Sequence, residues 1–200
     1  MPIKIHPLTI DRLDEALQVW EATLGNGFKL DRQEVADRLQ NGTGLFYIAL
    51  DDEPDRIVGI KFGYLDGEVC IGRGIGVLPE YRRQEIATLL LHRFEQDLQA
   101  IPAIKVYAFG SATTEGVPFH IAAGYYPQVL VQFTDRDLRP SLDFTQFNIS
   151  YEGYNEQYQV YQIFIPLDAS ETNLDHLRAL QAQYPQVNIQ YLFEKMFSRS

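Results

Sequence analysis

The feature that most constrains the fold is a strand, a short loop and a helix that follow one another along residues 68–98. Residues 68–77 are rich in Val and Ile, as a strand is, and residues 86–98 repeat apolar side chains at helical spacing. Such a junction aims the free N–H groups of a helix N-terminus at whatever lies in front of it, commonly an anion. Arg82 and Arg83 add positive charge at this point. The sequence therefore predicts an anion site, with an ordinary turn carrying solvated arginines as the alternative.

The predicted strand alternates branched apolar side chains with small ones. One predicted face carries Val69, Ile71, Arg73, Ile75 and Val77, and the other carries Cys70, Gly72, Gly74 and Gly76. Glycine weakens a strand, so three glycines on one face indicate close approach by a ligand or by another part of the chain. A bound ligand and a tightly packed helix explain this smooth face equally well.

The segments on either side have clear periodicity. Predicted strands cover residues 3–8, 45–50, 57–65 and 104–109, and predicted helices cover 31–39 and 117–123. Another helix, capped by Asp11, carries the apolar stripe Leu13, Ala16, Leu17, Trp20 and Leu24. The predicted order is a strand, two helices, a three-stranded meander, the central helix, a strand and a short helix.

Residues after 135 add a further segment. Strands are predicted at 129–134, at 144–151 and 158–165 with 152–156 as their connection, and at 187–193. A helix is predicted at 170–184, with Leu174, Leu177 and Leu180 on one face. We expect a domain at residues 1–135 and an extension at 136–200 packed on it, because so short a segment buries little surface by itself.

Composition narrows the classes of partner and location. The formal net charge of −10 repels nucleic-acid phosphates and anionic lipid and favours a cationic substrate. Cys70 is the only cysteine, which excludes an intrachain disulfide and a cysteine zinc cluster. No apolar run approaches the ~20 residues of a membrane span, and the first residues lack a signal peptide's apolar stretch. A reducing cytoplasm is the predicted location.

The loop resembles the acetyl-CoA pyrophosphate loop of the GNAT acetyltransferase superfamily. The family pattern Val-x-Pro-x-Tyr-Arg reads Val77-Leu78-Pro79-Glu80-Tyr81-Arg82, and Arg-x-x-Gly-x-Ala reads Arg82-Arg83-Gln84-Glu85-Ile86-Ala87. A second landmark, Phe119-His120-Ile121-Ala122-Ala123-Gly124-Tyr125, is similar to the family's Phe-Tyr-x-x-x-Gly-Phe helix end. The resemblance covers roughly residues 3–135. It implies an α/β (α+β) acyl-CoA N-acyltransferase fold, with a mixed central sheet flanked by helices and here an extra C-terminal β-β-α-β segment.

The resemblance also implies acetyl-CoA as the acyl donor. Its expected binding residues are Ile75, Gly76, Val77, Arg82, Arg83, Gln84, Glu85, Ile86 and Ala87. This chain has Glu85 where the family has glycine, and a carboxylate there would repel the phosphates and compete for their donors. The alternative is that Glu85 points outward and pairs with Arg82 or Arg83.

The candidate catalytic residues follow from the same resemblance. His120 occupies the position of the family's tyrosine, which protonates the leaving thiolate; a structural histidine is the alternative. Tyr125 and Tyr126 are nearby substitutes. The family's glutamate base corresponds to Ile71 here, and Glu68, acting through water, is the remaining candidate.

The predicted function is N-acetyl transfer from acetyl-CoA to a primary amine of a small molecule or peptide. The alternative is a GNAT-fold binding or regulatory module that has lost transfer, which Glu85 would explain. We expect no metal, nucleic acid or membrane partner, and the sequence leaves a homodimer open.

Overall fold

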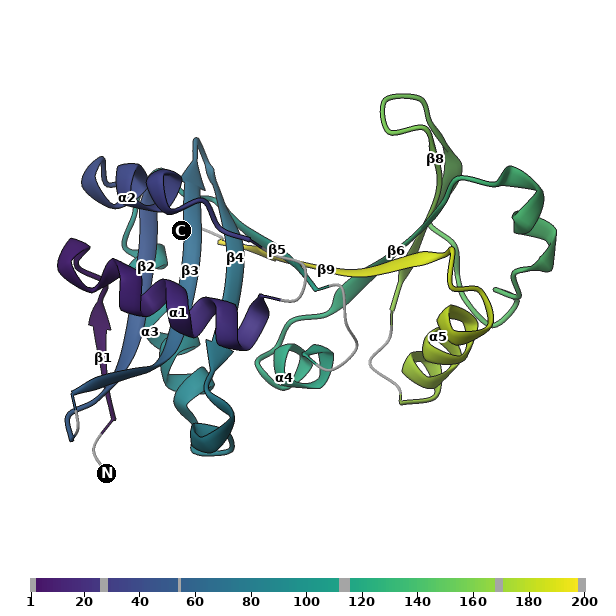
Figure 1. The fold of residues 1–200 in the computed structure, drawn as a ribbon. Coiled ribbons are helices and arrows are strands. Elements are labelled where there is room, and N and C mark those ends of the chain that lie inside the picture. The colour runs from purple at the N-terminus through teal and green to yellow at the C-terminus, as the bar shows by residue number, and fades with distance from the viewer. Residues whose placement is uncertain (1–2, 26–28, 54, 112–115, 168–170, 198–200) are drawn as a thin grey trace. The chain divides into compact units, whose positions relative to one another are not determined.

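The computed structural model describes residues 3–25, 29–53, 55–111, 116–167 and 171–197. The chain forms two compact units (Figure 1). Unit 1 comprises Met1–Ala108 and Met196–Ser200, and unit 2 comprises Phe109–Lys195. The predicted division at residue 135, and the packing of residues 136–200 on the first domain, stay predictions.

Unit 1 holds the meander that the sequence predicts. Its elements are β1 (Ile3–Pro7), η1 (Ile10–Arg12), α1 (Leu13–Leu24), α2 (Arg32–Gln40), β2 (Gly44–Asp51), β3 (Arg56–Asp66), β4 (Val69–Val77), η2 (Pro79–Tyr81), α3 (Ile86–Gln99) and the start of β5 (Val106–Ser111). Strands β1 to β4 pair in chain order, each antiparallel to the next. This confirms the mixed α/β fold class.

Helices cover both faces of this meander (Figure 1). On the α1 face, the rings of Trp20 and Phe62 stack with centroids 5.5 Å apart. On the α3 face, the Phe94 ring lies 6.1 Å from that of Tyr47 and 5.3 Å from that of Tyr107. All five side chains are buried. The predicted apolar face of α3 is buried throughout: Ile86, Leu90, Leu91, Phe94 and Leu98.

A β-bulge in β4 overturns the predicted face assignment of that strand. Phe62 pairs with Gly74 and Gly63 pairs with Gly72, so Arg73 is an extra residue without a partner in the register. An extra residue reverses the alternation of side chains beyond it. Cys70 therefore lies on the α3 face, whereas Gly74 and Gly76, beyond the bulge, lie on the α1 face.

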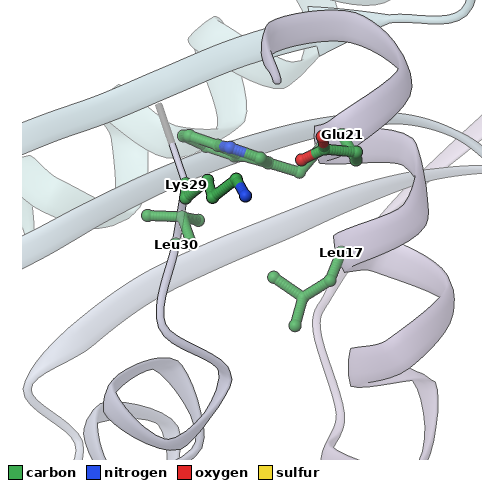
Figure 2. Close-up of a pocket in the computed structure, with 5 residues that line it drawn as sticks. Leu17, Glu21, Lys29 and Leu30 are labelled. Carbon is green, nitrogen blue, oxygen red and sulfur yellow. The ribbon is translucent and has the colours of Figure 1, made fainter. Parts of the chain in front are cut away.

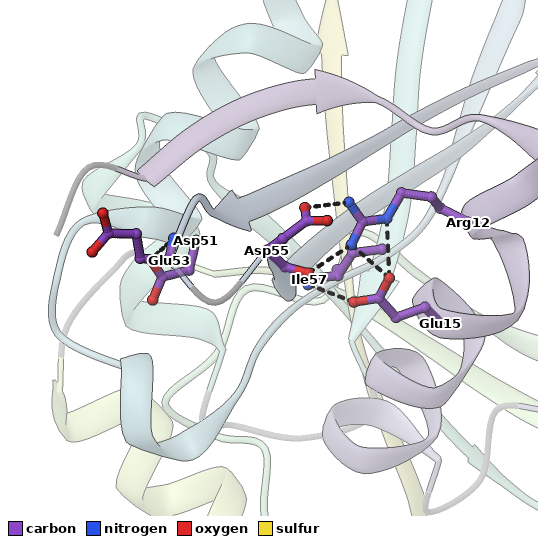
Figure 3. A network of polar contacts seen from close by, with 6 residues as sticks. All are labelled: Arg12, Glu15, Asp51, Glu53, Asp55 and Ile57. Carbon is purple, nitrogen blue, oxygen red and sulfur yellow. Dashed lines mark hydrogen bonds and ion pairs between the residues drawn. The ribbon is translucent and has the colours of Figure 1, made fainter.

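A polar network fixes the start of α1 (Figure 3). The Arg12 guanidinium donates to Glu15 Oε2 at 2.6 Å and to Asp55 Oδ1 at 2.9 Å, and the backbone N–H of Ile57 donates to Glu15 Oε1 at 2.7 Å. The predicted cap at Asp11 is wrong: Asp11 lies inside η1, and Arg12 is the N-cap of α1. The network joins the helix start to the turn between β2 and β3.

Unit 2 contains the extra strands. Its elements are the end of β5, α4 (Val117–Ala122), β6 (Pro127–Phe133), η3 (Arg136–Ser141), β7 (Tyr151–Asn155), β8 (Val160–Pro166), α5 (Glu171–Gln183) and β9 (Asn188–Met196), whose last residue falls in unit 1. Strand β6 pairs antiparallel with β8 on one side and with β9 on the other. The chain between β6 and β9 is thus an excursion that leaves one strand and returns beside it.

The predicted β-β-α-β order holds, but one strand was misplaced. Residues 144–150 do not form a strand, and only Tyr151 of the predicted segment belongs to one; Phe147 N–H bonds to the Phe144 carbonyl in a turn. The predicted connection at 152–156 instead belongs largely to β7. In α5, Leu174, Leu177 and Leu180 are buried as expected, and the predicted start at Ser170 lies outside the described residues. Across the described parts of the chain, no helix has both the length and the apolar character needed to span a membrane.

Candidate active site

The loop between β4 and α3 is anchored by its own motif residues. Leu78 N–H donates to the Val58 carbonyl at 2.9 Å, and Arg82 Nε donates to the Val77 carbonyl at 3.2 Å. The Tyr81 hydroxyl donates to the buried carboxylate of Asp51 at 3.0 Å, and this hydrogen bond raises the pKa of Tyr81. The motif tyrosine therefore ties the loop to the end of β2.

The backbone at the start of α3 adopts an unusual conformation. Arg83 and Glu85 have φ angles of 60° and 62°, in the left-handed region, and Glu85 is the N-cap of α3 without a side-chain capping bond. Glycine enters this region without a steric penalty, whereas a residue with a Cβ does not. The family's glycine at this position thus has a conformational reason besides close approach to phosphates.

The charged side chains of the loop face solvent. Arg82, Arg83, Gln84 and Glu85 are all exposed. Within the described part of the chain, neither arginine forms an ion pair with Glu85, so the expected pairing is not present. The first turn of α3 contains no acidic residue. A ligand phosphate would meet two guanidinium groups, one carboxylate and the unsatisfied N–H groups of the first turn.

The other expected cofactor residues contribute differently. Ile86 is buried in the core and Ala87 half-buried, so their expected contribution is the backbone N–H. Ile75 and Val77 are half-buried on the α3 face of β4. Gly76 is buried, and a Cβ there would clash with the side chain of Thr23 in α1. A packed helix therefore accounts for this glycine.

The second motif ends α4 as the resemblance implies. Gly124 has a φ of +86°, and the N–H of Tyr125 donates to the His120 carbonyl at 3.0 Å. A glycine in the left-handed conformation commonly ends a helix in this way. Tyr125 is buried and Tyr126 is exposed.

The His120 side chain lies among aromatic rings. Ring centroids of Phe109, Phe193 and Phe119 lie 4.5, 5.0 and 5.1 Å from that of His120, which is only 8% exposed. The Tyr125 ring is edge-on to the His120 ring, with the two centroids 6.3 Å apart. The structure thus brings His120 and Tyr125 together in unit 2, while the pyrophosphate-type loop belongs to unit 1.

Glu68 lies at the other end of β4 from the loop. It directly precedes the strand, and its exposed carboxylate forms an ion pair with Lys105. Its carbonyl also accepts hydrogen bonds from the N–H groups of Lys105 and Val106. Glu68 and the expected pyrophosphate site are therefore separated by the full length of β4.

A cavity of about 300 Å³ lies beside α1, away from this loop (Figure 2). Leu17, Trp20 and Leu30 form its apolar lining, and Glu21 and Lys29 bring one charge of each sign. No residue of the loop lines it. No group of three or more His, Cys, Asp or Glu among the described side chains could hold a metal ion.

Lys61 is a functional candidate that the sequence analysis did not identify. It is 2% exposed in the middle of β3, and burial lowers its pKa to about 8. The signal was a single lysine within an otherwise apolar strand, a pattern that usually marks an outward-facing side chain.

Comparison with known proteins identifies the family. A family model described as an acetyltransferase (GNAT) domain matches residues 10–115, more than half of the chain. A search of curated protein sequences finds no significant match.

Solved structures with this fold include several acetyltransferases. NAA60 of Arabidopsis thaliana, solved with a bisubstrate analogue, is 11% identical; the match covers 100% of each chain with a TM-score of 0.59. A ribosomal-protein-alanine N-acetyltransferase of Escherichia coli is 10% identical over 100% of this chain and 96% of that one, with a TM-score of 0.58. PaiA N-acetyltransferase of Thermoplasma acidophilum, solved with coenzyme A, is 14% identical over 98% of this chain and 100% of that one, with a TM-score of 0.54. At these identities the likeness shows the fold, and the domain match shows the family. The chain therefore belongs to the GNAT acetyltransferase domain family and is a GNAT-type acyltransferase.

Proposed function

We propose that this protein transfers the acetyl group of acetyl-CoA to a primary amine of a small molecule or peptide. The observation that carries the proposal is the start of α3, where two exposed arginines precede a helix N-terminus whose N-cap, Glu85, is in the left-handed conformation. Helix N-termini bind phosphate through N–H groups and the helix dipole. The coenzyme A complex of PaiA and the bisubstrate complex of NAA60 support this choice of cofactor class.

In the proposed reaction the amine nitrogen attacks the thioester carbonyl carbon and the C–S bond breaks. The amine loses one proton and the leaving thiolate gains one. The N–H groups of residues 82–87 hold the pyrophosphate, and His120 gives the thiolate its proton, with Tyr125 and Tyr126 as alternatives. Glu68 is the proposed base, acting through water. A cytoplasmic location belongs to the same proposal.

One observation favours a second function. The Glu85 carboxylate is exposed at the helix N-terminus, where the dipole and the arginines would otherwise favour phosphate. Two like charges ~4 Å apart cost about 1 kcal/mol in bulk water and more near a protein surface. If this repulsion prevents cofactor binding, the protein is a GNAT-fold binding or regulatory module.

Glu85→Gly and Arg83→Gly form a matched pair that tests the proposal. Each substitution places glycine at a position with left-handed backbone and so removes the conformational strain of a residue with a Cβ. Each should therefore raise the free energy of unfolding by up to ~1 kcal/mol. Their effects on acetyl-CoA should be opposite, because one removes a repelling carboxylate and the other an attracting guanidinium. We expect tighter binding by Glu85→Gly and weaker binding by Arg83→Gly in titration calorimetry.

A thermal shift of the unmodified protein completes the test. Acetyl-CoA at ~100 times its dissociation constant should add about 2.7 kcal/mol of stability. The absence of any shift at millimolar acetyl-CoA, for the unmodified protein and for Glu85→Gly alike, would reject the transferase and favour the binding module.

A further inference from the structure

Lys61 is a buried cation that contacts aromatic rings and backbone carbonyl groups. Its ammonium lies 4.3 Å from the ring centroid of Phe94 in α3 and 5.4 Å from that of Tyr107 in β5. Among the described residues it forms no ion pair, and the acidic groups that act to raise its pKa are the thiol of Cys70 and the carboxylate of Glu95. Burying a charge in this way destabilises the fold, so its position calls for another explanation.

The hydrogen bonds of Lys61 lead to the bulge in β4. Its Nζ donates to the Phe62 carbonyl at 3.2 Å and to the Gly74 carbonyl at 3.5 Å. Phe62 and Gly74 are register partners, and the register shifts immediately beyond them, at Arg73. One ammonium thus links β3 to β4 on the side of the bulge nearer the loop.

The bulge in turn sets the segment that leads to the cofactor loop. Residues 74–77 connect the bulge to that loop, and they include three of the expected cofactor-binding positions: Ile75, Gly76 and Val77. A bulge redirects the strand that carries it, so a shift at Gly74 changes where the following N–H and C=O groups point. Small displacements of binding groups have large effects on affinity and rate.

We propose that Lys61 is a positioning residue for acyl-CoA, holding the Gly74 carbonyl so that the β4 segment after the bulge keeps its cofactor-binding geometry. This rests on the proposed function, because it concerns the same site. Lys61 itself touches neither the cofactor nor the reacting atoms.

The pH dependence of acetyl-CoA binding provides a signature that a purely structural lysine lacks. Burial lowers the pKa of Lys61 from 10.5 to about 8. Between these values the folded protein has lost a proton that the unfolded chain still holds, so stability rises with pH. When Lys61 loses its positive charge, its hydrogen bond to the Gly74 carbonyl becomes weaker. The affinity for acetyl-CoA should therefore fall as the pH rises through 8. In the folded protein, burial raises the pKa of the facing Cys70 thiol to about 11, so this thiol stays protonated while Lys61 loses its proton.

The test compares the unmodified protein with Lys61→Met and with Cys70→Ala as the matched control in the same cluster. Acetyl-CoA affinity and thermal stability are measured from pH 7 to 9.5. We expect Lys61→Met to be at least as stable as the unmodified protein at pH 7, to bind acetyl-CoA ~10- to 100-fold more weakly and to lose both pH dependences. Cys70→Ala should keep the pH dependence of acetyl-CoA binding. Unchanged affinity and unchanged pH dependence of binding in Lys61→Met would overturn the proposal.

Amide hydrogen exchange separates this inference from the proposed function. If the unmodified protein binds no acetyl-CoA at any pH, the transferase proposal fails, and exchange in residues 72–77 then decides the role of Lys61. Faster exchange of residues 72–77 in Lys61→Met, with the rest of unit 1 unchanged, would support the proposal that Lys61 stabilises the bulge. Equal exchange in the two proteins would reject it.

Discussion

At the scale of single residues, Arg83 and Glu85 hold backbone conformations that their side chains disfavour. Each left-handed non-glycine residue costs roughly 1–2 kcal/mol relative to the right-handed region. The burial of Ile86 and Leu90 immediately afterwards offsets this cost, because it holds the helix start in place. Strain that persists at a loop of this kind is consistent with a constraint on function, which the Glu85→Gly and Arg83→Gly pair measures.

His120→Phe tests the proposed general acid. Because His120 is packed among Phe109, Phe119 and Phe193, another aromatic ring should be accommodated and the variant should fold. We expect kcat to fall by ~10²–10⁴-fold with little change in acetyl-CoA affinity, since a proton donor acts only as the thiolate leaves. The measurement is kcat per folded molecule. An unchanged kcat would leave Tyr125→Phe and Tyr126→Phe as the variants to examine.

Residue-level prediction succeeded where the sequence itself carries the cause. Gly124 was placed at a helix end, and its left-handed φ confirms the motif. Lys61 was missed because burial of a lysine depends on Phe94 and Tyr107, which reach it only in the folded chain. Motif spacing records local geometry and does not record such distant neighbours.

At the scale of elements, β4 shows why strand periodicity can mislead. The alternation of β4 was predicted in one unbroken register, and the bulge at Arg73 divides it. A bulge depends on the partner strand as well as on the strand's own sequence. Similarly, β7 was shifted because Phe144 and Phe147 resemble strand residues while forming a turn.

Gly76→Ala tests the packing of α1 on β4. A methyl group at Gly76 meets the Thr23 side chain with no room between them, so the helix or the strand must move. We expect a loss of ~1–3 kcal/mol of unfolding free energy, as for other overpacked sites. Gly110→Ala is the control, because the nearest atom to its methyl group, in Leu192, is 3.4 Å away. Denaturant titration measures both, and equal stability of the two variants would contradict the packing argument.

At the scale of the whole molecule, the order of the elements could be predicted from the sequence, whereas their assignment to compact units could not. Helical and strand periodicities gave the succession from β1 to β6 nearly residue by residue. The same periodicities do not say that β9 pairs with β6, since that pairing joins Gln132 to Asn188 across the entire excursion. The compact unit Phe109–Lys195 therefore could not be inferred from local signals.

Ending the chain at Val187 tests the importance of this pairing. The truncation removes β9, which leaves one edge of β6 unpaired and takes Ile189, Tyr191 and Phe193 out of the core. We expect the truncated protein to lose cooperative melting of unit 2 and to be cut rapidly by protease between β6 and its new end. A protein that ends at Phe197 is the control and should melt like the full chain. If the protein that ends at Val187 had the same melting behaviour as this control, β9 would not be needed for the stability of unit 2.

The return of the last strand to the side of β6 also has a consequence for synthesis in the cell. A nascent chain is released from the ribosome in order, so β6 is exposed to the surroundings while the excursion and β9 are still being made. Until β9 has been made, one edge of β6 can pair with other chains, because an unpaired strand edge is a template for association. Unit 2 can therefore be completed only after residues 188–196 have been synthesised, and its yield should depend on how well the cell shields this edge until then.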